Sequence, residues 1–115
     1  MNLNDVIELL VPRVVVPPAN PWRPVTGGYT SDLLSCVMAK AKAGNVWITL
    51  QGHPNIVAVA SLLDLAAIIV SEDASIDSMT IQKAEEEGIP VLQSALSTFS
   101  VIARLAAAGL PGADM

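Results

Sequence analysis

The chain contains one histidine, His53, and one cysteine, Cys36, so the side chains that could perform acid–base or nucleophilic chemistry are few. His53 lies in the stretch QGHPN, residues 51–55, between two apolar runs, which predicts a turn from a strand into a helix. Its imidazole could act as a general acid or base with Asp32 or Ser31 from a neighbouring turn. It could also contact a ligand, or only cap the following helix. Because the sequence shows no clear partner for the imidazole, we favour the structural role, then ligand contact, over catalysis.

The surroundings of Cys36 and the absence of known catalytic motifs argue against an enzyme. Cys36 is surrounded by Leu33, Leu34 and Val37, which is typical of a core or interface cysteine. The sequence contains no Walker-type phosphate loop, H-E-x-x-H, C-x-x-C or G-x-S-x-G motif. A single histidine and a single cysteine cannot form a usual zinc site. We therefore expect no catalytic residue, no metal site and no resident cofactor.

Strand and helix signals alternate along the chain with short links. This order is typical of βαβ units, and the strands are apolar throughout, as in a sheet covered on both faces. We therefore predict an α/β fold in three layers, with a central, largely parallel sheet and helices on both faces. The expected strands are 25–26, 46–50, 67–70 and 90–92, and the expected helices are 4–10, about 32–43, 56–65, 77–87 and 97–108.

Three segments are expected along the chain. Residues 1–24 combine a short helix with a proline-rich extended segment or edge strand that packs on the domain. Within this segment, Trp22 is expected to pack down as an anchor. Residues 25–110 form the α/β domain, and residues 111–115 are expected to be a frayed tail.

Four strand-to-helix turns are expected to gather at the carboxyl edge of the sheet, where open parallel sheets bind ligands. They are residues 27–32, 51–55, 71–77 and 93–97. The first two contain glycine and side-chain donors, and each precedes a helix N-terminus, so they could cradle a phosphate or another anion. The third carries three carboxylates and is interpreted as a solvated turn. The candidate ligand-binding residues are Gly27, Gly28, Ser31, Asp32, Gln51, Gly52, His53 and Asn55, with a phosphate or an adenine nucleotide as the possible ligand.

Composition limits the partners. The net charge is −5, and the chain has only four aromatic residues. We therefore expect no nucleic-acid partner and no attraction to an anionic membrane. Residues 56–70 are too short and too charged to span a bilayer. Because 52% of this small chain is hydrophobic, some apolar surface is expected to cover a partner, and a homodimer is the simplest case. A single cysteine and an acidic N-terminal segment without signal-peptide features indicate a cytoplasmic protein.

The blocks GGYTSDLLSCVMAKAKAGNVWITLQGHPNIVAVASLLDLAAIIV and AEEEGIPVLQSALSTFSVIARL resemble the DRTGG domain family over about residues 25–108. The chain looks most like the short stand-alone members. Similar domains form the N-terminal part of HPr kinase/phosphorylase and accompany CBS domains in some inorganic pyrophosphatases. The resemblance implies a largely parallel α/β fold, often a dimer, and no catalysis. The chain departs from the naming motif, because His53-Pro54 stands where Asp-Arg is expected and residues 71–73 read Ser-Glu-Asp where Thr-Gly-Gly is expected.

Three hypotheses about function follow. The leading one is a non-catalytic regulatory or accessory module that dimerises and contacts a partner protein or small ligand, as a regulator or subunit of a larger enzyme assembly. The second is a nucleotide- or phosphate-sensing domain. The third and weakest is a small enzyme that uses His53 with Asp32 or Ser31.

Overall fold

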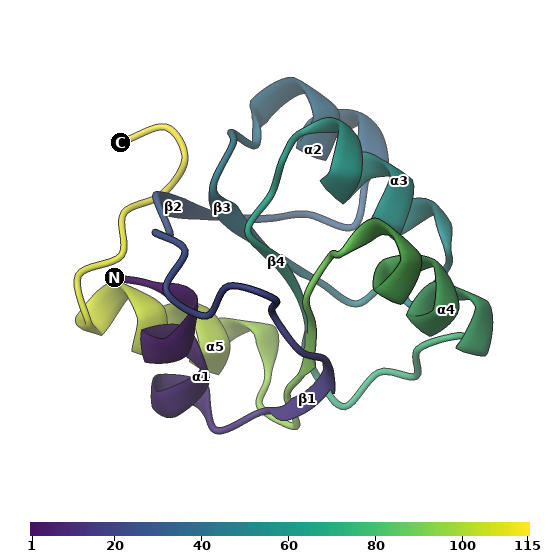
Figure 1. Ribbon diagram of the computed structural model, residues 1–115. Helices are drawn as coiled ribbons and strands as arrows, with labels where there is room; N and C mark the ends of the chain where they lie inside the picture. The colour runs from purple at the N-terminus through teal and green to yellow at the C-terminus, as the bar shows by residue number, and fades with distance from the viewer.

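Five helices and five strands alternate along the chain in the computed structural model, which describes residues 1–115 (Figure 1). Both ends of the chain lie on the same side of the molecule, near β2 and α1 (Figure 1). The elements are α1 (Leu3–Leu10), β1 (Arg13–Val16), β2 (Gly27–Thr30), α2 (Leu34–Lys40), β3 (Asn45–Thr49), α3 (Asn55–Leu62), β4 (Ala67–Val70), α4 (Ser78–Glu87), β5 (Val91–Gln93) and α5 (Thr98–Ala107).

The strands form one sheet in the order β1-β5-β4-β3-β2. β2 to β5 run parallel, and β1 joins the β5 edge antiparallel. Trp47 of β3 pairs with Ile68 of β4, and Ile69 of β4 pairs with Leu92 of β5. Every residue of β3 and β4 is buried, because helices cover both faces of these central strands.

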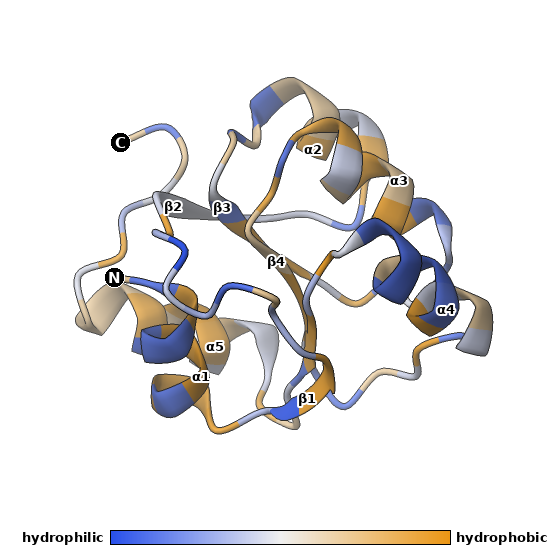
Figure 2. Ribbon diagram, in the orientation of Figure 1, coloured by the Kyte–Doolittle hydropathy of each residue, from blue (hydrophilic) through white to orange (hydrophobic).

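The helices form one layer on each face of the sheet, so the predicted three-layer α/β fold is confirmed (Figure 1). α2, α3 and α4 pack on the face that carries Trp47 and Ile68. α1 and α5 pack on the face that carries Ile48 and Ile69. Figure 2 shows the physical basis, since the strands are apolar and helices such as α1 and α4 carry polar residues on the side away from the sheet. No helix has the length and apolar character that a membrane crossing needs.

The structure corrects the boundaries around the first parallel strand. The sequence predicted a strand at 25–26, but β2 is Gly27–Thr30, because Gly27 pairs with Asn45 and Thr30 with Ile48 of β3. The following helix begins at Leu34, so neither Ser31 nor Asp32 caps it, and it ends at Lys40 instead of residue 43. The strand predicted at 67–70 is confirmed with the same bounds.

The proline-rich segment forms an edge strand, β1, and then a connector, but Trp22 is not its anchor. The Trp22 side chain is 67% exposed, so that expectation was wrong. The neighbouring Arg23 holds the connector instead, because its guanidinium donates to the Asp64 carbonyl at 2.8 Å and forms an ion pair with the Asp64 carboxylate at 3.2 Å. The backbone assists, with Leu3 N–H donating to the Arg23 carbonyl.

Residues 111–115 are not frayed, which corrects another expectation. Gly112 forms a parallel bridge with Gly28 of β2. The Gly28 N–H donates to the Pro111 carbonyl, and the Ala113 N–H donates to the Gly28 carbonyl. The tail therefore covers the first half of the exposed edge of β2 and buries Ala113.

Candidate functional site

The carboxyl edge of the sheet contains the point where the chain changes direction. The links after β2, β3 and β4 lead to helices on one face, whereas the link after β5 leads to α5 on the other face (Figure 1). In parallel sheets a crevice opens between two strands whose links diverge in this way. The crevice expected for a ligand therefore lies between the ends of β4 and β5.

The two corners favoured by the sequence, at the ends of β2 and β3, are joined by their own hydrogen bonds. The Asp32 carboxylate accepts from the Thr49 hydroxyl and from the Leu50 N–H, both at 2.8 Å. The Gln51 side-chain amide donates to the Asp32 carbonyl at 2.7 Å, and the Ser31 hydroxyl accepts from the Leu33 N–H. The structure thus brings Ser31, Asp32 and Gln51 together, but these groups bind one another and hold the two corners in place.

Gly52 is required by a close approach of two backbone segments. A Cβ at this position would lie 2.9 Å from the Cα of Ile76 and closer still to the Ser75 carbonyl oxygen. The Gly52 carbonyl accepts from the Thr80 hydroxyl at 2.6 Å and from the Asp77 N–H at 3.1 Å. Gly52 therefore anchors the β4–α4 link to the β3–α3 corner.

His53 has a local structural role. Its side chain is exposed, and Nδ1 accepts from the Asn55 N–H at 3.1 Å, which satisfies a donor of the first turn of α3. This is the only hydrogen bond of the imidazole. The catalytic arrangement with Asp32 or Ser31 is absent, because both of those side chains bind other groups.

Gly27 and Gly28 do not lie at the carboxyl edge, which corrects their assignment to the first corner. They begin β2, at the opposite end of the strand. A Cβ at Gly27 would lie 3.1 Å from the Pro111 carbonyl oxygen, so this glycine permits the tail to approach the sheet. The candidate residues predicted from the sequence therefore fall into three separate groups.

The third corner, at the end of β4, has an unusual backbone. Glu72 and Asp73 have φ values of +61° and +52°, which favour glycine. These are the positions where the resemblance to the DRTGG family leads us to expect two glycines. The Glu72 carboxylate accepts from the Thr98 N–H at 3.1 Å, and the Ser71 hydroxyl lies 2.7 Å from the Thr98 hydroxyl. This corner, interpreted from the sequence as a solvated turn, is therefore fastened to the start of α5.

A cavity of about 380 Å³, hereafter the polar cavity, opens beside this corner. Its charged lining consists of Arg13, Arg104 and Asp73. No ion pair involves any of these three groups, and the Arg104 guanidinium makes no hydrogen bond. The lining residues are Leu10, Val11, Pro12, Arg13, Asp73, Gln93, Ser94, Ala95, Leu96 and Arg104.

Sequence reasoning missed both arginines of the polar cavity. They lie on β1 and α5, at opposite ends of the chain, and no motif connects them. The reversal of direction after β5, which marks the third and fourth corners as the edges of the crevice, is visible only in the structure. No group of three potential metal ligands lies together anywhere in the structure.

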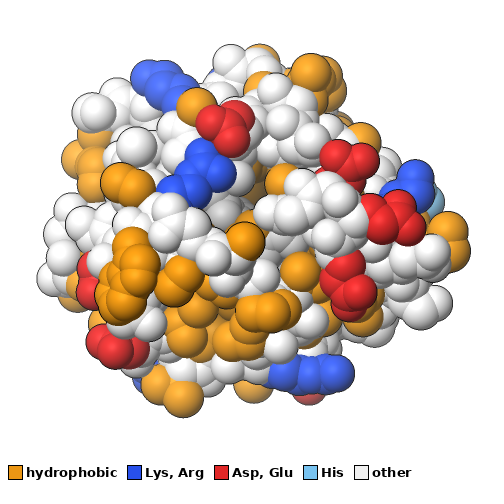
Figure 3. Space-filling model, viewed as in Figure 1, with side chains coloured by type: hydrophobic (Ala, Val, Ile, Leu, Met, Phe, Trp, Pro, Cys, Tyr) orange, Lys and Arg blue, Asp and Glu red, His pale blue; other side chains and the backbone are white.

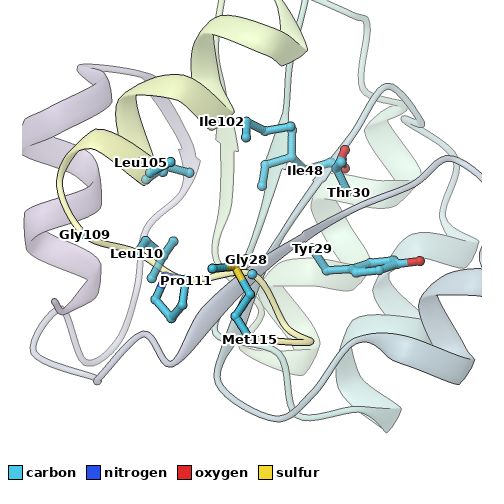
Figure 4. A pocket seen from close by; sticks show the side chains of 12 residues that line it. Gly28, Tyr29, Thr30, Ile48, Ile102, Leu105, Gly109, Leu110, Pro111 and Met115 are labelled. Carbon is cyan, nitrogen blue, oxygen red and sulfur yellow. Dashed lines mark hydrogen bonds between the residues drawn. The ribbon is translucent and has the colours of Figure 1, made fainter.

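A second cavity of about 510 Å³, hereafter the apolar cavity, lies beside β2, the edge strand on the opposite side of the sheet from β1 (Figure 4). Gly28 and Ile48 form its floor, Ile102 and Leu105 of α5 line one wall, and Leu110 with the rest of the tail lines the other. The Tyr29 ring points away from these side chains (Figure 4).

Comparison with known proteins finds similarity in structure but not in sequence. No family model matches the sequence, and no curated protein matches it. The fold matches the crystal structure of the CBS and DRTGG domains of the regulatory region of Clostridium perfringens pyrophosphatase, complexed with its activator diadenosine tetraphosphate. The TM-score is 0.75 at 17% identity, over 96% of this chain and 47% of that one.

This neighbour is a regulatory region, not a catalytic domain. The match fits the DRTGG-like fold suggested by the sequence and establishes the architecture. The chain spans about half the length of the matched structure.

Proposed function

We propose that this chain is a non-catalytic regulatory module that binds a small phosphate-bearing ligand, and that the polar cavity is its binding site. The observation that carries the proposal is the placement of Arg13 and Arg104 in one cavity at the switch point of the sheet. The chain has only three arginines and a net charge of −5, so this is a local concentration of positive charge in an acidic protein.

The chemistry of the lining suits a phosphate. A guanidinium presents several N–H groups in a plane and can hold two phosphate oxygens at once. The Arg13 guanidinium makes one long contact, 3.4 Å to the Gln93 side-chain oxygen, and keeps its other donors free. The Ala95 N–H donates to no protein group, so it adds a backbone donor at the same edge. Two arginines against one aspartate leave the lining with a net positive charge.

An adenine nucleotide is the first ligand class to test. The matched regulatory region was solved with diadenosine tetraphosphate, which bears the same base and phosphate groups. The cavity, at about 380 Å³, lies near the lower end of the roughly 300–1,000 Å³ typical of small-ligand sites. We therefore expect a mononucleotide to fit better than a dinucleotide polyphosphate.

Calorimetry with AMP, ADP, ATP, adenosine and inorganic phosphate tests this proposal. We expect the phosphate-bearing compounds to bind and adenosine to bind weakly. Arg104→Gln should weaken binding at least about tenfold, since a hydrogen bond to a charged group contributes about 1.5–3 kcal/mol. Lys83→Gln makes the same charge change at an exposed position of α4 and should leave the affinity nearly unchanged.

Two results would overturn the proposal. One is the absence of binding across the panel at near-millimolar ligand. The other is an equal affinity of the wild-type chain and the Arg104→Gln variant, which would place any ligand outside the polar cavity.

A further inference from the structure

The outer face of α5 is apolar, although it faces solvent. Phe99 is 81% exposed and Ile102 is 36% exposed. Ala103 and Ala106 continue the same stripe at helical spacing, and α5 carries no carboxylate. A helix at the surface of a lone domain normally presents polar residues on this face, so the stripe is suited to contact another surface.

The same face also carries a hollow. Ile102 and Ala106 line the apolar cavity, about one and two turns beyond Phe99 along α5. Gly28 has no side chain, so it leaves the floor of the cavity unfilled. A Cβ at Gly28 would make only ordinary contacts, the nearest at 3.5 Å. One helix face therefore bears both a projecting aromatic ring and a cavity that is large enough for such a ring.

We propose that this face binds a second copy of the chain, with the two α5 helices antiparallel about a twofold axis near Ile102 and Ala103. A twofold interface uses the same patch on both subunits, so it must be complementary to itself. Phe99 and Ala106 are seven residues apart, or about 10 Å along the helix. An axis midway between them places Phe99 of each copy against Ala106 of the partner subunit, at the mouth of the partner's apolar cavity.

Charge favours this face for contact between copies. Two chains of net charge −5 repel each other, and the approach costs least along a helix such as α5 that carries no carboxylate of its own. Glu72 lies at its N-terminal end, where its carboxylate is engaged by the Thr98 N–H. Figure 3 shows acidic side chains on the side of the molecule that carries α4 and also on the side that carries α1. Among the carboxylates, Asp114 is nearest in sequence to the residues that line the apolar cavity, because it precedes Met115. The proposal goes beyond ligand binding in the polar cavity and does not depend on it.

Sedimentation equilibrium from low-micromolar to near-millimolar chain tests the proposal. We expect the wild-type chain to form a reversible dimer. Phe99→Ser should weaken dimerisation at least about thirtyfold, because buried aromatic anchors dominate such interfaces. Leu62→Ser is the matched control, since Leu62 is 70% exposed on α3, in the opposite layer, and this variant should dimerise like the wild type.

Disulfide trapping locates the axis independently. In a Cys36→Ser background, Ala103→Cys should give a covalent dimer on mild oxidation, and Leu62→Cys should not. The proposal is wrong if the wild-type chain remains monomeric at every concentration. It is also wrong if Phe99→Ser dimerises like the wild type, or if native mass spectrometry finds a monomer whose apolar cavity holds a small molecule.

Discussion

The two cavities of this domain share one helix but differ in every property that selects an occupant. Arg104 of α5 lines the polar cavity at the carboxyl edge, whereas Ile102 and Leu105 line the apolar cavity beside β2. The first presents two guanidinium groups, and the second presents no charged side chain. The polar cavity can bind a ligand through charge-assisted hydrogen bonds, whereas the apolar cavity can bind a partner through complementary shape and buried apolar area. Binding at the first should therefore weaken with salt, and association at the second should not.

A third region sharpens this comparison. The corner at 51–55 attracted the sequence analysis because it contains His53 and a glycine, but its polar groups satisfy the protein itself. The two cavities, by contrast, contain free arginine donors or an uncovered apolar lining. Side chains that have no partner within the protein, and not residue types known from catalysis, mark the regions that can bind an outside partner.

The largest effect is expected at Gly52. Gly52→Ala should lower the free energy of unfolding by at least about 2 kcal/mol, because the new methyl group would overlap the backbone of Ser75 and Ile76. Gly28→Ala is the control, since its methyl group has room, and it should change the stability by less than about 1 kcal/mol. Urea denaturation measures both, and equal losses would contradict a structural role specific to Gly52.

The next largest effect is expected from filling the apolar cavity. Gly28→Leu places a side chain on the cavity floor and should weaken dimerisation at least about tenfold by blocking Phe99 of the partner subunit. At chain concentrations where both proteins are monomeric, the affinity for phosphate compounds should stay the same, because the polar cavity lies at the other end of the sheet. A loss of both properties in calorimetry and sedimentation would show that the two cavities are not separate sites.

A smaller effect is expected at Asp73, the one carboxylate that lines the polar cavity. Asp73→Asn should raise the affinity for a phosphate compound about threefold to tenfold, because it removes a repulsion of about 1 kcal/mol. Asp73→Gly should do the same and also raise the stability by up to about 1 kcal/mol, since φ is +52° there. Unchanged affinity in both variants would place the phosphate elsewhere.

The smallest effect is expected from coupling between the cavities through α5. A saturating phosphate ligand should change the dimer dissociation constant by about fivefold, the lower end of typical coupling between two sites. The dimer must then change the ligand affinity by the same factor. Sedimentation with and without ligand measures the first factor, and calorimetry at two chain concentrations measures the second. A dimer dissociation constant that does not change with ligand would exclude this coupling.

The sequence predicted the parts of the fold that depend on local patterns. The strand at 67–70 and the helices predicted at 77–87 and 97–108 follow from short-range preferences, and in the structure Gly88 ends α4 and Ser97 caps α5. It failed where pairing with a distant strand decides the outcome. Gly27 and Gly28 look like a turn, but β3 and the tail draw them into the sheet.

The candidate site was harder to predict for the same reason. Arg13 and Arg104 meet only because β1 adds antiparallel to β5 and because α5 crosses to the face of α1. Neither event leaves a motif in the sequence. The resemblance to the DRTGG family marked residues 71–73 as a departure from Thr-Gly-Gly, but the positive φ values of Glu72 and Asp73 were not predicted.

The most direct test of the central claim is a titration of the ¹⁵N-labelled chain with AMP, followed by amide chemical shifts. The account predicts that the largest shifts occur at Asp73, at Ser94 to Leu96 and at Arg104. Inorganic phosphate should move a subset of the same amides. Shifts confined to Ser31, Asp32 and residues 51–55, or no shift at near-millimolar AMP, would contradict a phosphate site in the polar cavity.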